Sequence, residues 1–163
     1  MTKKFLLIIA VVFIYAGTAS AQVKDLNFKL THQIIETQSY VVGDDEGHTV
    51  GVAKGTGLGY FDEGVAVLTA YFIFDYTDGN GGFTGYYVIE FTDESEITLK
   101  AVGTALEYPD EKKTVFDTEI TYIGGKGKYL GITGKGTMIG QRKNRVESGA
   151  PVFLEVTSTY ENR

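Results

Sequence analysis

The chain has 163 residues, of which 43% are hydrophobic and 22% charged, with 21 glycines, two prolines and no cysteine. This composition indicates one globular domain and excludes a disordered or collagen-like chain. Without cysteine, the chain has no disulfides, thiolate metal sites or cysteine nucleophiles. The formal net charge of −6 argues against a nucleic-acid partner, because binding to phosphates needs a basic surface.

The first 21 residues have the pattern of a signal peptide. Lys3 and Lys4 precede an apolar run over 5–17, and an Ala-Ser-Ala cleavage pattern ends at Ala21. The run is shorter than the ~20 residues that span a bilayer, so we expect cleavage and no stable membrane anchor. Residues 22–163 are then one domain with 13 basic and 21 acidic residues. We expect it to be exported to the bacterial periplasm or the medium.

The remaining chain predicts an all-β fold. Segments rich in Val, Ile, Thr, Tyr and Phe alternate with glycine-rich or acidic turns, and no helical period persists. The short turns favour antiparallel hairpins, and closing such a meander removes its exposed edges. We therefore predict a single eight-stranded antiparallel up-and-down β-barrel. Its expected strands cover 26–42, 50–61, 64–76, 83–92, 97–108, 114–123, 135–142 and 152–160.

Two of these strands depart from simple alternation. The strand from Val65 to Phe74 is apolar on both faces, so its outer face needs a cover. That cover is either a second copy of the chain or an overlying terminal segment. In the strand over 50–61, four glycines and Ala53 share one face. Such a bare face serves barrel curvature or the close approach of a backbone or ligand, and we expect curvature.

A glycine-rich stretch over 124–136 follows the predicted strand that ends at Ile123. It lacks the Gly-Lys-Ser/Thr of a phosphate loop and the spacing of a dinucleotide fingerprint. We expect it to close the barrel, with Tyr129 and Leu130 filling the barrel mouth and several residues at positive φ. The motif residues are Gly124, Gly125, Gly127, Tyr129, Gly131 and Gly134.

This stretch resembles the GGTG-[KR]-[YF]-x-G-x-x-G signature of allene oxide cyclase-like and dirigent-like barrels. It runs Gly124-Gly125-Lys126-Gly127-Lys128-Tyr129-Leu130-Gly131-Ile132-Thr133-Gly134. The resemblance implies an eight-stranded calycin-like barrel with a short helical turn between two late strands. Lys126 stands where the family usually has threonine, and no motif around the family's catalytic residues is present to carry an activity over.

Other candidates for chemistry are weak. His32 and His48 have no second ligand at metal-binding spacing, and Asp75, Asp78 and Asn80 lack the later acidic residue of a calcium loop. No serine lies in a nucleophile elbow. Asp117 and Glu119 share a face, but alternation places Phe116, Thr118 and Ile120 inward and the two acids outward. We expect no metal and no cofactor.

Charge is uneven along the chain. Six basic residues and no acidic residue lie in the segment from Lys126 to Arg145. This segment is consistent with an anion-binding patch near one barrel end, an oligomer contact or a solvated loop.

Two functional hypotheses follow. The chain is either a binding or structural protein with a small apolar ligand in an aromatic lumen, or a cyclase or isomerase of a reactive apolar substrate, like the enzymes it resembles. The second needs an ionisable residue in the lumen, and alternation places few there, so binding is favoured. The expected lumen residues are Phe72, Phe74, Tyr87, Phe91, Phe116 and Tyr122.

Overall fold

The computed structural model describes residues 22–143, 146, 149 and 151–162. The predicted signal peptide therefore lies outside the described residues. Strands make up most of the described chain, and two single-turn 3₁₀ helices join them. The elements are β1 (Lys24–Asp25), β2 (Phe28–Val41), β3 (His48–Phe61), β4 (Gly64–Thr77), β5 (Asn80–Glu90), β6 (Glu96–Tyr108), η1 (Pro109–Glu111), β7 (Lys113–Lys126), η2 (Gly127–Tyr129), β8 (Ile132–Lys143) and β9 (Pro151–Asn162).

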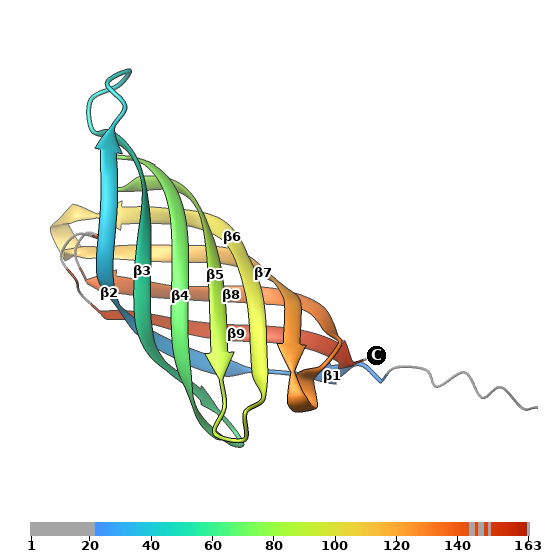
Figure 1. The fold of residues 1–163 in the computed structure, drawn as a ribbon. Helices are drawn as coiled ribbons and strands as arrows, with labels where there is room; N and C mark the ends of the chain where they lie inside the picture. Colours follow the sequence, from blue (N-terminus) through green and yellow to red (C-terminus); the bar gives the residue numbers. More distant parts are fainter. Residues whose placement is uncertain (1–21, 144–145, 147–148, 150, 163) are drawn as a thin grey trace, which may run out of the picture.

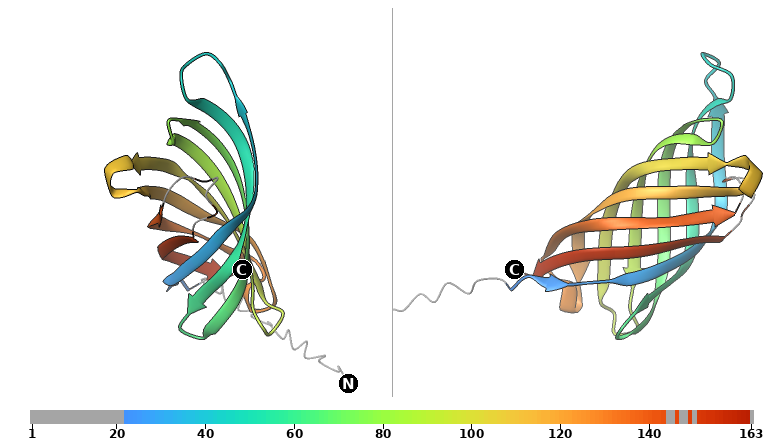
Figure 2. Two further views of the ribbon diagram at one scale, coloured as in Figure 1. Left: turned by 90° about the vertical axis from the view of Figure 1, so that its left-hand side faces the viewer. Right: turned by 180° about the vertical axis from the view of Figure 1, so that it is seen from behind.

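The eight long strands form a closed antiparallel barrel, as the sequence predicts (Figure 1). Consecutive strands pair from β2 to β9, and β9 also pairs with β2, which closes the sheet. The short strand β1 pairs with the far end of β9, outside this ring. The two further views show the strands wrapping around one lumen at a marked tilt (Figure 2).

Side chains alternate between the lumen and the solvent along each strand. In β7, Phe116, Thr118 and Ile120 are buried, and Asp117 and Glu119 are exposed. This confirms the orientation expected from alternation and excludes the two acids from the lumen. The packed lumen is the hydrophobic core of the protein.

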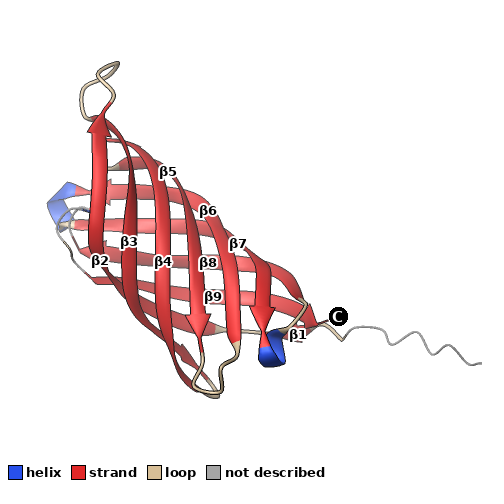
Figure 3. Cartoon of the chain, viewed as in Figure 1, coloured by secondary structure: helices blue, strands red, loops and turns tan. Residues whose placement is uncertain are grey.

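The barrel has two ends with different connections. One end carries the connections β2–β3, β4–β5, β6–β7 and β8–β9, and we call it the pocket end after the pocket described below. The other end carries β3–β4, β5–β6 and β7–β8, and we call it the plug end because the buried side chain of Tyr129 lies there. Because η1 follows β6 and η2 follows β7, the two helical turns lie at opposite ends (Figure 3). The connection between β2 and β3 projects beyond the barrel at the pocket end (Figure 1).

The glycine-rich stretch forms a tighter turn than the sequence predicts. β7 continues to Lys126 and β8 begins at Ile132, so the turn occupies only 127–131. Gly127 and Gly131 have φ of 58° and 74°, in the left-handed region that favours glycine. Tyr129 is buried, whereas Leu130 is 69% exposed. The expectation that Leu130 fills the barrel mouth is therefore wrong, because the turn is too short to direct both side chains inward.

The outer face of the strand from Val65 to Phe74 is exposed. Val67, Tyr71 and Ile73 have exposed fractions of 53%, 47% and 58%, and no described terminal segment covers them. A second copy of the chain remains the predicted cover. No helix among the described residues is long and apolar enough to cross a membrane.

Candidate functional site

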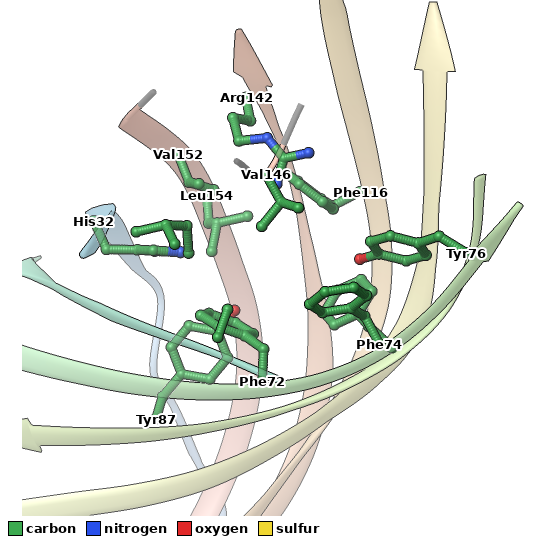
Figure 4. Close-up of a pocket in the computed structure, with 13 residues that line it drawn as sticks. His32, Phe72, Phe74, Tyr76, Tyr87, Phe116, Arg142, Val146, Val152 and Leu154 are labelled. Carbon is green, nitrogen blue, oxygen red and sulfur yellow. The ribbon is translucent and has the colours of Figure 1, made fainter. Parts of the chain in front are cut away.

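A pocket enters the lumen between aromatic side chains from both sides of the barrel (Figure 4). Phe72, Phe74 and Tyr76 reach it from β4, and Phe116 reaches it from β7. Val146, from the connection between β8 and β9, also lines the pocket. The pocket therefore lies near the barrel end that carries this connection. The other lining residues are His32, Ile34, Ala53, Phe83, Tyr87, Arg142, Val152 and Leu154.

The pocket is narrow. The cavity has a volume of about 30 Å³, which is enough for about two waters. It widens toward solvent, and the whole empty space, including the open part, is about 410 Å³. A ligand of the size that protein pockets usually hold therefore requires lining side chains to change rotamer.

His32 is one of the polar side chains of the pocket, and alternation along β2 directs it inward with Leu30 and Ile34. Its ring stacks on Phe72, with centroids 5.3 Å apart and planes at 22°. It also meets Tyr87 edge-on at 6.0 Å. Burial, and to a smaller extent the charge of Arg142, lowers the pKa of His32 from 6.5 to about 4, so the ring is neutral at pH 7.

Arg142 brings a positive charge to the pocket from β8, although only 5% of it is exposed. Its guanidinium donates a hydrogen bond of 3.3 Å from Nη2 to Thr114 Oγ1. The same group lies over the Phe116 ring, with Cζ 5.5 Å from the ring centroid. The expectation that alternation places few ionisable groups in the lumen therefore missed both His32 and Arg142.

The bare face of β3 makes room for these side chains. A Cβ on Gly55 would lie 2.9 Å from His32 Cδ2, and a Cβ on Gly51 would lie 2.5 Å from Phe74 Cζ. A Cβ on Gly57 would meet the backbone oxygen of Thr31 at 1.9 Å, so close strand approach also requires glycine. The glycines of β3 thus permit side-chain packing and close strand approach inside the lumen, while their role in curvature stays a prediction.

Four of the six residues expected in the lumen line this pocket, namely Phe72, Phe74, Tyr87 and Phe116. Tyr122 is buried elsewhere, where its hydroxyl lies 2.6 Å from Ser158 Oγ and burial raises its pKa to about 12. Phe91 lies at the plug end, with its ring centroid 5.3 Å from that of Tyr129. The prediction omitted His32, Tyr76, Phe83 and Arg142.

Solved structures that are similar to this chain include two barrels. A pterocarpan synthase dirigent protein matches with a TM-score of 0.53 and 12% identity, over 99% of this chain and 100% of its own. A conserved protein of unknown function from Rhodopseudomonas palustris matches with a TM-score of 0.56 and 13% identity, over 87% of this chain and 99% of its own. The fold is that of the dirigent-like barrels. No family model matches the chain, and no curated protein matches it either.

The fold implied by the glycine motif is thereby confirmed, and η2 is the short helical turn that the resemblance implies. At such low identity, the likeness concerns the fold alone. Residue roles in this chain must therefore be argued from its own pocket.

The basic segment from Lys126 to Arg145 does not form one patch. Lys126 pairs with Glu96, and Lys128 pairs with Glu63 and Asp93, all at the plug end. Arg142 lies in the pocket near the opposite end. Because β8 runs the length of the barrel between them, the single anion-binding patch considered from the sequence is wrong; Arg145 lies outside the described residues.

His48 lies on the outside of the pocket end. Its Nδ1 lies 2.5 Å from Asp44 Oδ1 and its Nε2 lies 2.8 Å from Asp75 Oδ1. These hydrogen bonds, that to Asp44 first, raise the pKa of His48. Within the described ranges, no three His, Asp or Glu side chains are grouped so as to hold a metal ion.

Proposed function

We propose that the chain is an exported binding protein that holds a small, largely apolar molecule in the barrel lumen. The observation that carries the proposal is the pocket itself, with side chains of Phe72, Phe74, Phe83 and Phe116 around a narrow opening. Apolar and aromatic walls with a few polar groups are typical of small-molecule sites. Export is part of the proposal and rests on the signal-peptide pattern over 1–21.

Native mass spectrometry of the protein recovered from its host tests both parts. We expect a mature chain that begins at Gln22 and carries a retained small molecule. A chain that still contains 1–21 would contradict export. Protein that neither retains a ligand nor binds any apolar fluorescent probe would contradict lumen binding.

A pair of variants locates the binding. Ala53 is 6% exposed and lines the pocket, whereas Val52, the next residue of β3, points outward and is 48% exposed. Ala53→Leu adds volume to a narrow pocket, so it should weaken probe binding at least tenfold. Val52→Leu should leave probe binding unchanged. Equal effects of the two substitutions would place the ligand outside the lumen.

A cyclase or isomerase is the second candidate, and one observation favours it. His32 and Arg142 line the same pocket, so the lumen holds the ionisable groups that such chemistry needs. Arg142 is suited to stabilising negative charge that develops on a substrate oxygen. The neutral ring of His32 is suited to donating a hydrogen bond to a substrate oxygen or accepting one from a substrate hydroxyl. In this reading, the aromatic walls fold the substrate into a reactive conformation.

Chromatography of the extracted ligand separates the two candidates. The ligand pool is incubated with fresh protein and compared before and after incubation. An isomerase changes the retention time of a compound without changing its mass, and His32→Leu should slow that change. A binding protein leaves both the retention time and the mass unchanged.

A further inference from the structure

His32 carries a buried polar atom without a hydrogen-bond partner. The side chain is only 3% exposed, and its Nδ1 has no partner among the residues that the structure describes. In native proteins the large majority of buried polar atoms are hydrogen-bonded, and an unpartnered one lowers the free energy of unfolding. An apolar residue in this position would avoid that cost, so the histidine calls for an explanation.

The surroundings of His32 hold the ring in place but give Nδ1 no hydrogen-bond partner among the described residues. Phe72 stacks on one face of the ring and Tyr87 meets it edge-on, which fixes its orientation. Gly55 supplies the space for the ring, since a Cβ there would lie 2.9 Å from Cδ2. Figure 4 shows the side chain reaching into the pocket, with a ring nitrogen toward the interior. The ring is therefore positioned for a partner that enters the pocket.

The charge state of His32 limits that partner. The neutral imidazole has one N–H donor and one nitrogen acceptor, so it suits a hydroxyl or a carbonyl group. Burial, together with the positive charge of Arg142, opposes protonation of the ring, so the ring keeps both its donor and its acceptor nitrogen at neutral pH. The rest of the lining is mostly apolar and favours an apolar body around that single oxygen.

We propose that His32 is the specificity-determining residue of the pocket and that it hydrogen-bonds the oxygen of an uncharged apolar molecule bearing one hydroxyl or carbonyl group. This inference rests on the proposed function, because it requires a ligand in the lumen. It adds the chemical class of the ligand and the residue that selects it.

The test compares probes that share one apolar body. Binding of naphthalene, 2-naphthol and the anion 2-naphthoate is measured by fluorescence with the wild type, His32→Leu and His32→Asn. For each protein, the affinity for 2-naphthol is divided by the affinity for naphthalene. This affinity ratio should be about tenfold higher in the wild type than in His32→Leu, which is the effect of one buried hydrogen bond. His32→Asn, which keeps a polar atom near the position of Nδ1, should restore part of the ratio.

Thr118→Val is the matched control. Thr118 Oγ1 is also buried and has no described partner, but Thr118 does not line the pocket. Removing this hydroxyl should leave the affinity ratio at the wild-type value. A ratio that falls equally in Thr118→Val and His32→Leu would overturn the assignment to His32.

Three other results would also overturn the inference, and they differ in what they leave standing. Equal ratios in the wild type and His32→Leu would overturn it but leave lumen binding intact. A preference for 2-naphthoate that His32→Leu does not alter would assign ligand selection to Arg142. A wild type that binds none of the probes would overturn the proposed function together with the inference.

Discussion

The hydroxyl of Tyr129 donates a hydrogen bond to Glu63 Oε1, which joins the turn after β7 to the turn after β3 at the plug end. The ring of Tyr129 is 4% exposed and packs against Phe91 and Tyr160. Lys128, from the same turn, pairs with Glu63 at 2.6 Å. Tyr129 therefore closes the lumen at the end opposite to the pocket.

Truncating this tyrosine should destabilise the protein. Tyr129→Ala removes a buried ring and should lower the free energy of unfolding by about 3 kcal/mol. Tyr129→Phe removes only the hydrogen bond and should lower it by about 1 kcal/mol. Leu130→Ala is the control and should change it little, because Leu130 is exposed. Chemical denaturation measures all three, and an equal loss in Leu130→Ala would contradict this assignment.

The glycines of the same turn should differ in their tolerance of alanine. Gly131 has φ of 74°, so Gly131→Ala should lower the free energy of unfolding by about 1 kcal/mol through backbone strain. A Cβ on Gly124 would meet no atom within 4 Å, and its φ is not positive, so Gly124→Ala is the control. The comparison fails if both variants unfold at the same denaturant concentration.

Alternation predicted most of the fold, because it depends on the local pattern of side chains. It placed Phe116 and Ile120 inward and located eight strands close to their observed bounds. The sequence predicts a longer turn than the observed 127–131, because glycine permits both extended and left-handed backbone. Sequence alone did not distinguish glycines that continue β7, such as Gly125, from those that turn.

The polar groups of the pocket were harder to predict. His32 shares its parity with Phe28 and Leu30, a signal that indicates an inward side chain. For Arg142 the signal is weaker, because Gly136 and Gly140 leave Met138 as the nearest side chain on the same face of β8, while the apolar Ile139 lies on the opposite, exposed face. Because charged side chains are rarely buried, the sequence alone favours a surface position for Arg142.

Acid should destabilise the protein partly through His32. Its pKa is about 4 in the folded state and 6.5 when unfolded, so between these values the unfolded chain binds more protons and stability falls as pH falls. This loss in the free energy of unfolding reaches about 3 kcal/mol at pH 4 and vanishes above pH 7. His32→Leu should remove it. Denaturation of both proteins from pH 7 to pH 4 measures the difference, and parallel pH profiles would contradict the burial of His32.

His48 should have the opposite pH dependence. Its pKa is raised by Asp44 and Asp75, so its stabilising contribution is complete below pH 6.5 and is lost as pH rises through the raised value. Proton NMR can follow both rings, because the chain has only two histidines. We expect His48 to titrate above 6.5, and Asp44→Asn to lower its midpoint. A midpoint unchanged by Asp44→Asn would contradict the hydrogen bond.

Association of the barrel should involve the outer face of β3 and β4. Exposed apolar residues pair across these strands in register, Val52 with Ile73 and Leu58 with Val67. Contiguous apolar surface of this kind is typical of protein interfaces. We therefore predict that the mature protein forms a homo-oligomer through this face, and that light scattering coupled to size-exclusion chromatography gives a mass above that of one chain.

Charge introduced into this face should dissociate the oligomer. Ile73→Lys places a solvated cation where apolar contact is expected, so the measured mass should fall to that of a monomer. Ile139→Lys is matched in size and exposure, since Ile139 is 54% exposed and Ile73 is 58% exposed. Ile139 lies on β8, four strands away around the barrel, so its variant should keep the oligomer. Dissociation by Ile139→Lys alone would place the interface on the opposite side, and a monomeric wild type would reject association through either face.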